Sequence, residues 1–583
     1  MIRTLAKSLR EYKNGSIFTM ILSILEVVFE IVIPLYMSDL IDFGIEEGSL
    51  GNVFKYGFAL ILFAIMELIT GVLSAKLAAK ASAGFSANLR QDMYDNVQRF
   101  SFSNIDKFSS ASIVTRLTTD VTNIQNAWQM IIRMAIRGPV MMIFAMCVSF
   151  SISHDISMIF LVLIPILAVL LFLIMRGVNP YFKRVFRTYD QLNSVVEEDV
   201  RGIRVVKSCN RESYEIRKFD GISESIYQDF SKGEKLLALN SPLMQLCMYG
   251  CMILISWIGA KAIVASGNNA ALGLTTGQLT ALLSYAQQIL MSLMMLSMVL
   301  TMITMSASSG NRIAEILNEK PDITNPEHPV MEVKDGSIEF EHVDFVYSTK
   351  ADKKVLSDIN LKIRSGDTIG MIGGTGSSKS SLVQLIPRLY DAASGKVSVG
   401  GIDVKQYDLK TLRESVAMVL QKNELFSGTI AENLRWGNEN ATDEQLVQAC
   451  RLACADEFIS ALPDGYNTHI DQGGTNVSGG QKQRLCIARA LLKSPKVLIL
   501  DDSTSAVDTR TDAEIRMAFA EKIPNTTKII IAQRVSSVKD ADSIIVMDDG
   551  RISAQGTHEE LLKTSSIYRE VYESQQKGDQ DHE

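Results

Sequence analysis

Residues 363–382, IRSGDTIGMIGGTGSSKSSL, decide the fold of the C-terminal half of the chain. The short apolar run Thr368–Ile372 predicts a β-strand, and the apolar residues after Ser381 recur at the spacing of a helix. Between them lies a glycine-rich turn that ends in Lys379 and Ser380. The backbone N–H groups of such a turn and the positive end of the following helix attract polyphosphates. The stretch therefore predicts a phosphate-binding loop.

The residues of this loop and the start of its helix are the candidates for contact with phosphates. Lys379 would reach the terminal phosphates, and the Ser380 hydroxyl would bind a magnesium ion. The strict pattern G-x-x-x-x-G-K-[ST] has a glycine where this chain has Ser378. The candidates are Gly373, Gly374, Thr375, Gly376, Ser377, Ser378, Lys379, Ser380 and Ser381.

Length and composition divide the chain into two unlike halves. Its 583 residues are too many for one domain. Long apolar stretches precede residue 310, whereas the sequence after residue 330 has the composition of a soluble α/β domain. The formal charge of −7 gives no indication of nucleic-acid binding. The seven cysteines show no metal-site spacing, and their two i, i+4 pairs favour buried thiols.

The N-terminal half contains six apolar stretches, each near the roughly 20 residues that a helix needs to cross a bilayer. Lys and Arg near the start place the N-terminus in the cytoplasm by the positive-inside rule. Both termini are then expected inside, and the long charged connectors predict that several spans continue as helices into the cytoplasm. The predicted spans are about 17–41, 53–77, 128–152, 156–177, 241–265 and 277–305.

The sequence therefore predicts a membrane all-α domain with six transmembrane helices, followed by an α/β phosphate-loop domain. Proline ends helices, so Pro321, Pro326 and Pro329 indicate a linker between the two. The expected boundaries are 1–310 for the membrane domain, 311–336 for the linker, 337–575 for the α/β domain and 576–583 for a polar tail.

Three glutamates lie within the predicted spans. Glu26 and Glu30 are one helical turn apart in the first span, and Glu67 lies in the second. Ionisable groups at membrane depth are costly and face a polar cavity or a partner. They are candidates for a cation-attracting or proton-titrating lining of a substrate path. Pairing with Arg133 or Arg137 for purely structural reasons is an equal alternative.

The sixth span is rich in methionine. Flexible thioether side chains suit a wall that adapts to varied apolar ligands. A packed helix interface uses the same spacing, so packing and ligand binding both remain open for each residue. The candidates for the cavity wall are Met295, Met298 and Met302.

Two further strands belong to the phosphate-loop domain. Residues 497–502, VLILDD, form an apolar run that ends in two acids and is typical of a buried strand. Asp501 would hold magnesium directly or through water, and Asp502 would lie beside the terminal phosphate. Residues 338–347 alternate like a strand and end in Tyr347, whose ring could stack on an adenine face.

Residues 476–492, NVSGGQKQRLCIARALL, predict a helix that opens at Ser478 and presents a second anion-attracting N-terminus. A phosphate loop, then V-S-G-G-Q, then an apolar strand ending in acids resemble the ATP-binding cassette. With six spans before them, the whole sequence is similar to an ABC exporter half-transporter, and the resemblance covers essentially all of the chain.

The resemblance implies that two such chains pair and hold two ATP molecules between their cassettes. Each ATP, with Mg²⁺, would lie between one chain's phosphate loop and the other chain's signature. Ser380, Gln421 and Asp501 resemble the residues that serve the metal, with Gln421 linking it to the membrane domain. The residues that match the signature for the partner's ATP are Ser478, Gly479, Gly480 and Gln481.

Other positions match family elements one by one. Tyr347 resembles the adenine-stacking aromatic residue. Residues 505–508, which end in Asp508, resemble the D-loop. The polar breaks near Asn104–Ser109 and Glu212–Arg217 resemble coupling helices, which connect membrane helices to the cassettes.

The chain departs from the family pattern at residues that serve its own ATP. Asp502 stands where the family has a catalytic Glu, and Gln533 stands where it has the switch His. Gln472 replaces a frequent Glu, and Ser378 replaces the loop glycine. One missing methylene retracts the carboxylate from the attacking water, and Gln transfers no proton near neutral pH. The signature, in contrast, matches fully.

This asymmetry predicts the degenerate-site subunit of a heterodimeric, multidrug-type exporter. Its partner would be a second half-transporter with the consensus Glu and His, and membrane lipid would surround both. The cargo would be amphipathic or drug-like solutes or lipids. From the resemblance, the expected location is a bacterial plasma membrane, with the cassette in the cytoplasm.

Two alternatives stay open at this point. The chain could be an ATP-sensing regulatory or gating subunit without a transport path of its own. It could also be a homodimeric exporter of lipids or peptides, in which case both ATP sites would carry the same weakened residues.

Overall fold

The computed structural model describes residues 1–268, 273–347, 353–503 and 506–580. The chain forms two compact units. The first, which we call the helical unit, comprises Met1–Gln98 and Ser110–Glu319. The second, the α/β unit, comprises Lys320–Glu583 together with the short segment Arg99–Ser109.

Within the described ranges, six helical rods are long and apolar enough to cross a membrane. Each contains one of the six predicted spans, so that prediction is confirmed. In lipid, a helix is favoured because it satisfies every backbone polar group internally. The rods are Tyr12–Glu46 (α2, Tyr12–Asp39, and η2, Leu40–Glu46), Leu50–Gln98 (α3), Ser110–Ile152 (α5, Ser110–Thr115, η3, Arg116–Asp120, and α6, Val121–Ile152), His154–Ser208 (α7), Glu212–Ser266 (α8, Glu212–Leu237, and α9, Asn240–Ser266) and Thr276–Asn318 (α10).

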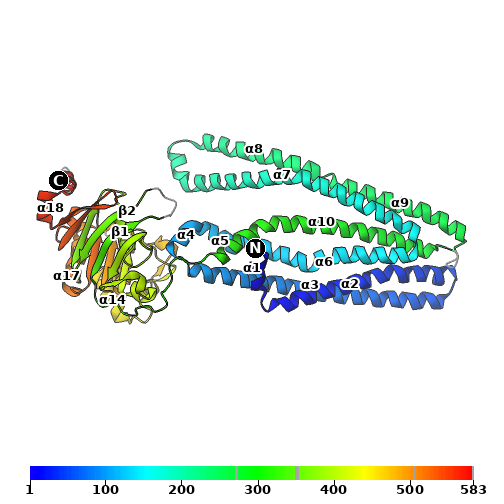
Figure 1. Ribbon diagram of the computed structural model, residues 1–583, viewed down its shortest axis with the longest axis horizontal. Coiled ribbons are helices and arrows are strands. Elements are labelled where there is room, and N and C mark those ends of the chain that lie inside the picture. The colour runs from blue at the N-terminus through cyan, green and yellow to red at the C-terminus, as the bar shows by residue number, and fades with distance from the viewer. Residues whose placement is uncertain (269–272, 348–352, 504–505, 581–583) are drawn as a thin grey trace. The chain divides into compact units, whose positions relative to one another are not determined.

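The helical unit is built from pairs of neighbouring helices. α2 lies along α3, α6 along α10, and α7 along α8, as Figure 1 shows. A buried cluster that includes Val27, Ile31, Ala145 and Ile255 joins the helices. The buried Tyr285 hydroxyl donates a hydrogen bond of 2.7 Å to the carbonyl oxygen of Ile31. Short helices α1 (Ile2–Leu5) and η1 (Ala6–Leu9) precede α2.

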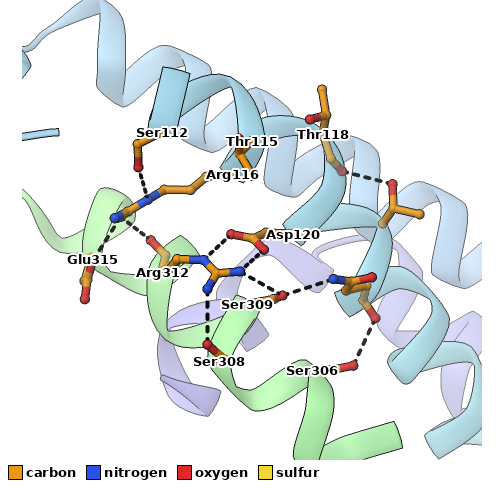
Figure 2. Close-up of polar contacts among 12 residues, drawn as sticks. Ser112, Thr115, Arg116, Thr118, Asp120, Ser306, Ser308, Ser309, Arg312 and Glu315 are labelled. Atoms are coloured by element: carbon orange, nitrogen blue, oxygen red, sulfur yellow. Dashed lines mark hydrogen bonds and ion pairs between the residues drawn. The ribbon is translucent and has the colours of Figure 1, made fainter. Parts of the chain in front are cut away.

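A polar cluster ties η3 and the N-terminal end of α6 to α10 (Figure 2). Asp120 ends the π-helical turn η3, and its carboxylate is fully buried. The Arg312 guanidinium on α10 forks onto both oxygens of this carboxylate. Arg116 donates to the Glu315 carboxylate at 2.9 Å and to the carbonyl oxygen of Arg312 at 2.8 Å. A bidentate guanidinium–carboxylate pair of this kind attracts the two helices and also fixes their register.

The helical boundaries differ from those expected from sequence at three places. α10 runs to Asn318, past residue 310, because Ile313 and Ile316 are buried against neighbouring helices. The C-terminal helix α19 (Ser566–Gln580) takes in the start of the expected polar tail. At the second polar break, residues 209–211 form a turn and α8 begins at Glu212, so no separate short helix stands there within the described residues.

The physical reason at the second break is negative charge at the N-terminus of a helix. The carboxylates of Glu212 and Glu215 lie in the first turn of α8, where they favour a helix start. The Lys207 ammonium donates to Glu212 at 3.0 Å across the turn. At the first break a short helix does occur, α4 (Phe102–Phe108).

The described residues of the α/β unit form three sheets. Their orders are β2-β1-β4-β5, β12-β11-β3-β10-β9-β6 and β7-β8. The strands are β1 Ile338–Phe345, β2 Leu356–Ile363, β3 Thr368–Gly373, β4 Ser394–Val399, β5 Ile402–Asp403, β6 Val416–Val419, β7 Gly428–Thr429, β8 His469–Ile470, β9 Val497–Asp501, β10 Thr527–Ile531, β11 Ser543–Asp548 and β12 Arg551–Gly556.

Helices pack on these sheets and close two apolar cores. The α-helices are α11 Lys379–Gln384, α12 Leu409–Ser415, α13 Ile430–Arg435, α14 Asp443–Leu452, α15 Asp456–Ser460, α16 Gly479–Leu491, α17 Thr509–Lys522 and α18 His558–Thr564, besides α4 and α19. The 3₁₀ turns are η4 Val404–Gln406, η5 Gly465–Asn467, η6 Gln472–Gly474 and η7 Val535–Ser537.

The register of the six-stranded sheet places the functional segments together. β3, β10 and β9 are parallel neighbours, with Met371 opposite Ile531 and Ile531 opposite Asp501. Their carboxyl ends therefore meet at one edge, which is where α/β sheets bind ligands. β9 and β10 are buried throughout, as expected for central parallel strands.

The polar cluster of Figure 2 predicts unequal effects of two neighbouring substitutions. Arg312→Ala leaves the buried Asp120 carboxylate without its cation and is expected to destabilise the protein by about 3 kcal/mol. Glu315→Ala, the control, removes a mostly exposed carboxylate, and the buried Arg116 keeps its hydrogen bonds to Ser112 and to the Arg312 carbonyl oxygen, so the loss should be smaller, about 1–2 kcal/mol. Thermal unfolding of the full chain in lipid measures both. Equal losses would contradict this account of the cluster.

Candidate functional site

The phosphate loop connects β3 to α11 with a closely packed backbone. A Cβ on Gly373 would lie 2.3 Å from the carbonyl oxygen of Met547 and 2.7 Å from the Ser377 hydroxyl oxygen, so only glycine fits. Ser378 has φ +70° and ψ +25°, in the left-handed region. That is the position where the strict pattern has glycine, and a Cβ there costs roughly 1–2 kcal/mol.

Lys379 turns back over this loop. Its ammonium donates to the carbonyl oxygens of Gly373 at 2.8 Å and Gly374 at 2.9 Å, and to the Ser377 hydroxyl at 3.1 Å. Burial lowers the pKa of the Lys379 ammonium from its ordinary value. A polyphosphate in the loop would supply the anion that offsets this desolvation.

Ser380 and Asp501 form the oxygen pair expected of a magnesium site. The Ser380 hydroxyl donates to the Asp501 carboxylate at 2.9 Å. Burial, reinforced by the neighbouring Asp502 charge, raises the pKa of Asp501, so a bound cation would be favoured there. The described residues contain no group of three His, Cys, Asp or Glu placed to hold a metal. Nucleotide phosphates and water would thus supply the remaining ligands of a bound magnesium ion, as is usual for this ion.

The two non-consensus residues bind each other. The Gln533 side-chain amide donates to the Asp502 carboxylate at 2.7 Å. Asp502 follows β9 with φ +50°, and its backbone N–H donates to the carbonyl oxygen of Ile531 at 3.1 Å. The Asp502 carboxylate, which would face the terminal phosphate, is therefore held by a neutral amide that neither gains nor loses a proton near neutral pH.

Gln575, which no sequence motif singles out, fixes the segment that carries Gln533. Its side-chain amide donates to the carbonyl oxygen of Gln533 at 2.7 Å, and its amide oxygen accepts from the Val535 backbone N–H at 2.9 Å. Gln575 lies on α19, 42 residues further along the chain. A side-chain contact over that separation leaves no local sequence pattern.

Tyr347 and Gln421 both reach solvent. The Tyr347 side chain is 46% exposed, and its ring stands edge-on to Phe345 and Tyr390, with centroids 4.8 and 5.1 Å away. Its hydroxyl lies 2.8 Å from the Ser381 hydroxyl on α11. One ring face is thereby positioned beside the phosphate loop. Gln421 is exposed in the loop after β6.

The signature residues cap their own helix, α16. The Ser478 hydroxyl accepts from the Gln481 backbone N–H at 3.3 Å, and the Gln481 side chain accepts from the Ser478 backbone N–H at 2.9 Å. A Cβ on Gly480 would lie 2.9 Å from the carbonyl oxygen of Ala506, whose N–H donates to Gln483 at 3.1 Å. Gly479, the first residue of the helix, also faces Ala506.

The D-loop match is described only in part. Residue 505 lies outside the described residues, whereas 506–508 lie within them. Asp508 caps α17 by accepting from the Thr511 backbone N–H at 3.0 Å, and these hydrogen bonds lower the pKa of its carboxyl. Its role in the structure is that of an N-cap.

Two of the membrane glutamates are paired with one arginine. The Arg137 guanidinium donates to Glu26 and to Glu30, in each case at 2.7 Å, and so ties α6 to α2. Glu26 is 6% exposed and Glu30 partly buried. The structural pairing weighed in the sequence analysis is thus present for two of the three glutamates. Glu67 is partly buried on α3.

The three candidate methionines of α10 differ in exposure, and none is fully buried. Met298 is exposed, whereas Met295 and Met302 are partly buried. A hollow on the helical unit runs along α9, lined by Tyr249, Met252 and Trp257, and contains none of these methionines.

Comparison with known proteins follows the same division of the chain. The family model described as the ABC transporter transmembrane region matches residues 16–293, and the one described as ABC transporter matches residues 356–505. YfiB of Bacillus subtilis, named as an uncharacterized ABC transporter ATP-binding protein, is 35% identical over 97% of this chain and 97% of its own length.

Two further comparisons concern cargo and fold. A Mycobacterium bovis protein named as a fatty acid ABC transporter ATP-binding/permease protein is 33% identical over 91% of this chain and 82% of its own length. The solved structure of a bacterial Atm1-family ABC exporter with ATP bound covers 97% of this chain and 98% of that one, with a TM-score of 0.82. At 22% identity, this likeness concerns the fold.

The strained serine of the phosphate loop predicts a stabilising substitution. Ser378→Gly is expected to add roughly 0.5–1 kcal/mol, since glycine enters the left-handed region without a steric penalty. Thr375→Gly is the matched control, because Thr375 is exposed in the same loop outside that region. Nucleotide-free thermal unfolding compares them. A rise with Thr375→Gly, or a loss with Ser378→Gly, would contradict the assignment of strain.

The ion pairs of Arg137 predict a loss that neutral partners rescue. Arg137→Met leaves the buried Glu26 unpaired and should destabilise the protein by about 3–5 kcal/mol. Adding Glu26→Gln and Glu30→Gln removes both carboxylate charges and should restore most of the stability. Unfolding in lipid is the measurement. If Arg137→Met kept full stability, the carboxylates would not be structural partners of this arginine.

Proposed function

This chain belongs to the ABC transporter family as a multi-pass membrane half-transporter, and from that premise we propose that it is the degenerate-site subunit of a heterodimeric exporter. ATP would drive amphipathic or drug-like solutes or lipids out of the cytoplasm. The chain's own ATP site would bind ATP and hydrolyse it slowly. Its signature would complete a competent site on the partner chain.

The observation that carries this proposal is the hydrogen bond between Gln533 and Asp502. Asp502 is one methylene shorter than Glu, and a misplacement of about 1 Å can cost on the order of 10²-fold in rate. The Gln533 amide holds the carboxylate in place but neither takes nor gives a proton near neutral pH. A site with these residues favours tight binding over turnover.

The binding parts of the same site support retained ATP binding. Lys379, Ser380 and Asp501 are assembled at one sheet edge, and Tyr347 stands beside them. With nucleotide bound, ATP supplies the phosphates and magnesium the positive charge between them. The protein's own groups would then orient both and exclude water from the closed dimer.

The helical unit supports pairing with a second chain. α7 and α8 pack on each other through Arg184 with Asp229 and through the rings of Phe182 and Phe230. Apolar side chains nevertheless remain exposed along both helices, which is typical of a face that another chain covers. They include Val196, Val200, Ile203, Val205, Ile216 and Phe219.

Direction and cargo follow from the premise. ATP favours the closed cassette dimer over the open one, and that difference in affinity would turn the membrane cavity outward. Hydrolysis at the partner's site would reset it. The relative named as a fatty acid transporter supports an amphipathic, lipid-like cargo. Relatives from Bacillus and Mycobacterium support a bacterial plasma membrane as the location.

The test is ATPase activity in lipid, with the chain alone and co-expressed with a half-transporter of the same genome that carries the consensus Glu and His. The pair should be active and the chain alone nearly inactive. Asp502→Glu with Gln533→His should raise the activity of the chain alone by up to about 10²-fold. In the pair, Asp502→Asn should change little, and Glu→Gln at the partner's catalytic position should abolish activity.

Two outcomes would contradict the proposal. An active dimer of this chain alone that Asp502→Asn abolishes would make Asp502 a working base and the site non-degenerate. Solute that crosses inverted vesicles downhill without hydrolysis would instead indicate a gate. Substrate-dependent ATPase with vectorial uptake separates an exporter from that gate.

A further inference from the structure

The short helix α4 is part of the α/β unit by packing, although its neighbours in sequence, α3 and α5, belong to the helical unit. Asn104 is 1% exposed and donates to the carbonyl oxygen of Lys320 at 3.2 Å. Ser103 donates to the Asp322 carboxylate at 2.8 Å. The Phe102 ring packs against the core beneath the four-stranded sheet. These contacts seat α4 on the α/β unit.

Tyr390 is the residue of the α/β unit that holds α4 with both its ring and its hydroxyl. The hydroxyl donates to the Asp106 carboxylate on α4 at 2.7 Å, and the ring lies 5.9 Å from that of Phe102. Burial raises the pKa of the Tyr390 phenol, and so do its hydrogen bond to Asp106 and the negative charge of that carboxylate. The phenol therefore stays a hydrogen-bond donor at any physiological pH.

The same tyrosine touches the proposed base site. Its ring stands at 87° to the Tyr347 ring, with centroids 5.1 Å apart. Phe345 contacts both rings, with centroids 4.8 Å from Tyr347 and 5.7 Å from Tyr390. Edge-to-face contacts of this kind have a preferred geometry, so movement of one ring is felt by the next.

The turn that carries Tyr390 is held rigidly behind the phosphate loop. It follows α11, whose first residue is Lys379. Arg388 forms an ion pair with Asp391 at 2.8 Å, and Arg413 donates to the carbonyl oxygen of Arg388 at 2.8 Å. Tyr390 thus has little freedom to relax away from α4 when Tyr347 is displaced.

We propose that Tyr390 is a positioning residue that reports occupancy of the base site to α4, through its ring contact with Tyr347 and its hydrogen bond to Asp106. A purine stacked on the exposed face of Tyr347 fixes that ring and, through it, the Tyr390 ring. The Tyr390 hydroxyl then holds Asp106 and the seat of α4. A polyphosphate without a base fills the loop but leaves the rings unfixed.

This inference rests on the proposed binding of ATP by this chain, but not on transport. It states that the base of the nucleotide, and not its phosphates, changes the contacts of α4. It also assigns Asp106 the role of acceptor on α4, which the sequence analysis does not single out.

Hydrogen–deuterium exchange of the full chain in lipid tests the inference, with the backbone amides of residues 102–108 as the readout. MgATP should slow the exchange of these amides about two- to tenfold. That is the change in the local opening equilibrium expected from stabilising α4 by roughly one hydrogen bond. Magnesium tripolyphosphate at saturating concentration, confirmed by competition against a fluorescent ATP analogue, should not. In Tyr390→Phe and Asp106→Ala, the effect of MgATP on α4 should be lost while the ATP Kd stays within about twofold.

Two further variants separate coupling from general damage. Tyr568→Phe is the matched control, because it also removes the hydroxyl of a buried tyrosine that bonds a side chain, His558, in the same unit. It should leave the response of α4 to MgATP intact. Asp106→Asn keeps an acceptor oxygen and should retain part of the response. Tyr390→Phe combined with Asp106→Ala should be no worse than either alone, as expected for one shared interaction.

The outcomes are distinguishable. If wild-type chain shows no measurable ATP affinity, the proposed function fails at its ATP-binding step. If ATP binds and α4 is protected equally by tripolyphosphate, or equally in Tyr390→Phe, the inference is overturned while the proposed function stands. Additive losses in the double variant would also overturn it.

Discussion

The seating of α4 is the constraint on which the rest of the structure depends. Seven residues, Phe102–Phe108, are joined covalently to the long helix α3 and to the rod that begins with α5, yet they belong by packing to the α/β unit. The hydrogen bond from Asn104 to Lys320 therefore fixes, within the α/β unit, a segment that interrupts the helical unit in the sequence.

The parallel sheet supplies the second half of this arrangement. Three neighbouring strands deliver the phosphate loop, Gln533 and Asp501 to one edge, and α11 runs from that edge to the turn that carries Tyr390. The phosphate loop and the contacts of Tyr390 with α4 therefore lie on one continuous segment of the chain. The polar cluster around Asp120 holds the helical unit together in a similar way, because it locks the start of α6 to α10.

Sequence predicted the parts of the fold that local physics determines. Membrane spans need only an apolar run of sufficient length, and the strand of residues 368–373 is marked by the glycine loop that follows it. What could not be predicted depends on contacts across long separations. No local sequence pattern indicates the hydrogen bond from Gln575 to the Gln533 backbone or the one from Tyr390 to Asp106. The same is true of the buried C-terminal end of α10. At Glu212 two acids favoured a helix start over a transverse helix.

The two departures at the hydrolytic position are best understood as one feature. A carboxylate at Asp502 needs a donor, and the Gln533 amide supplies it at 2.7 Å while Gln575 holds the Gln533 backbone. Replacing either residue alone by the family consensus would leave the other with an altered partner, because a longer carboxylate and an imidazole both change the reach of this pair. The site is thus satisfied as it stands. Under the proposed function, in which this subunit binds ATP as a clamp, such an internally satisfied position would keep its shape without turnover.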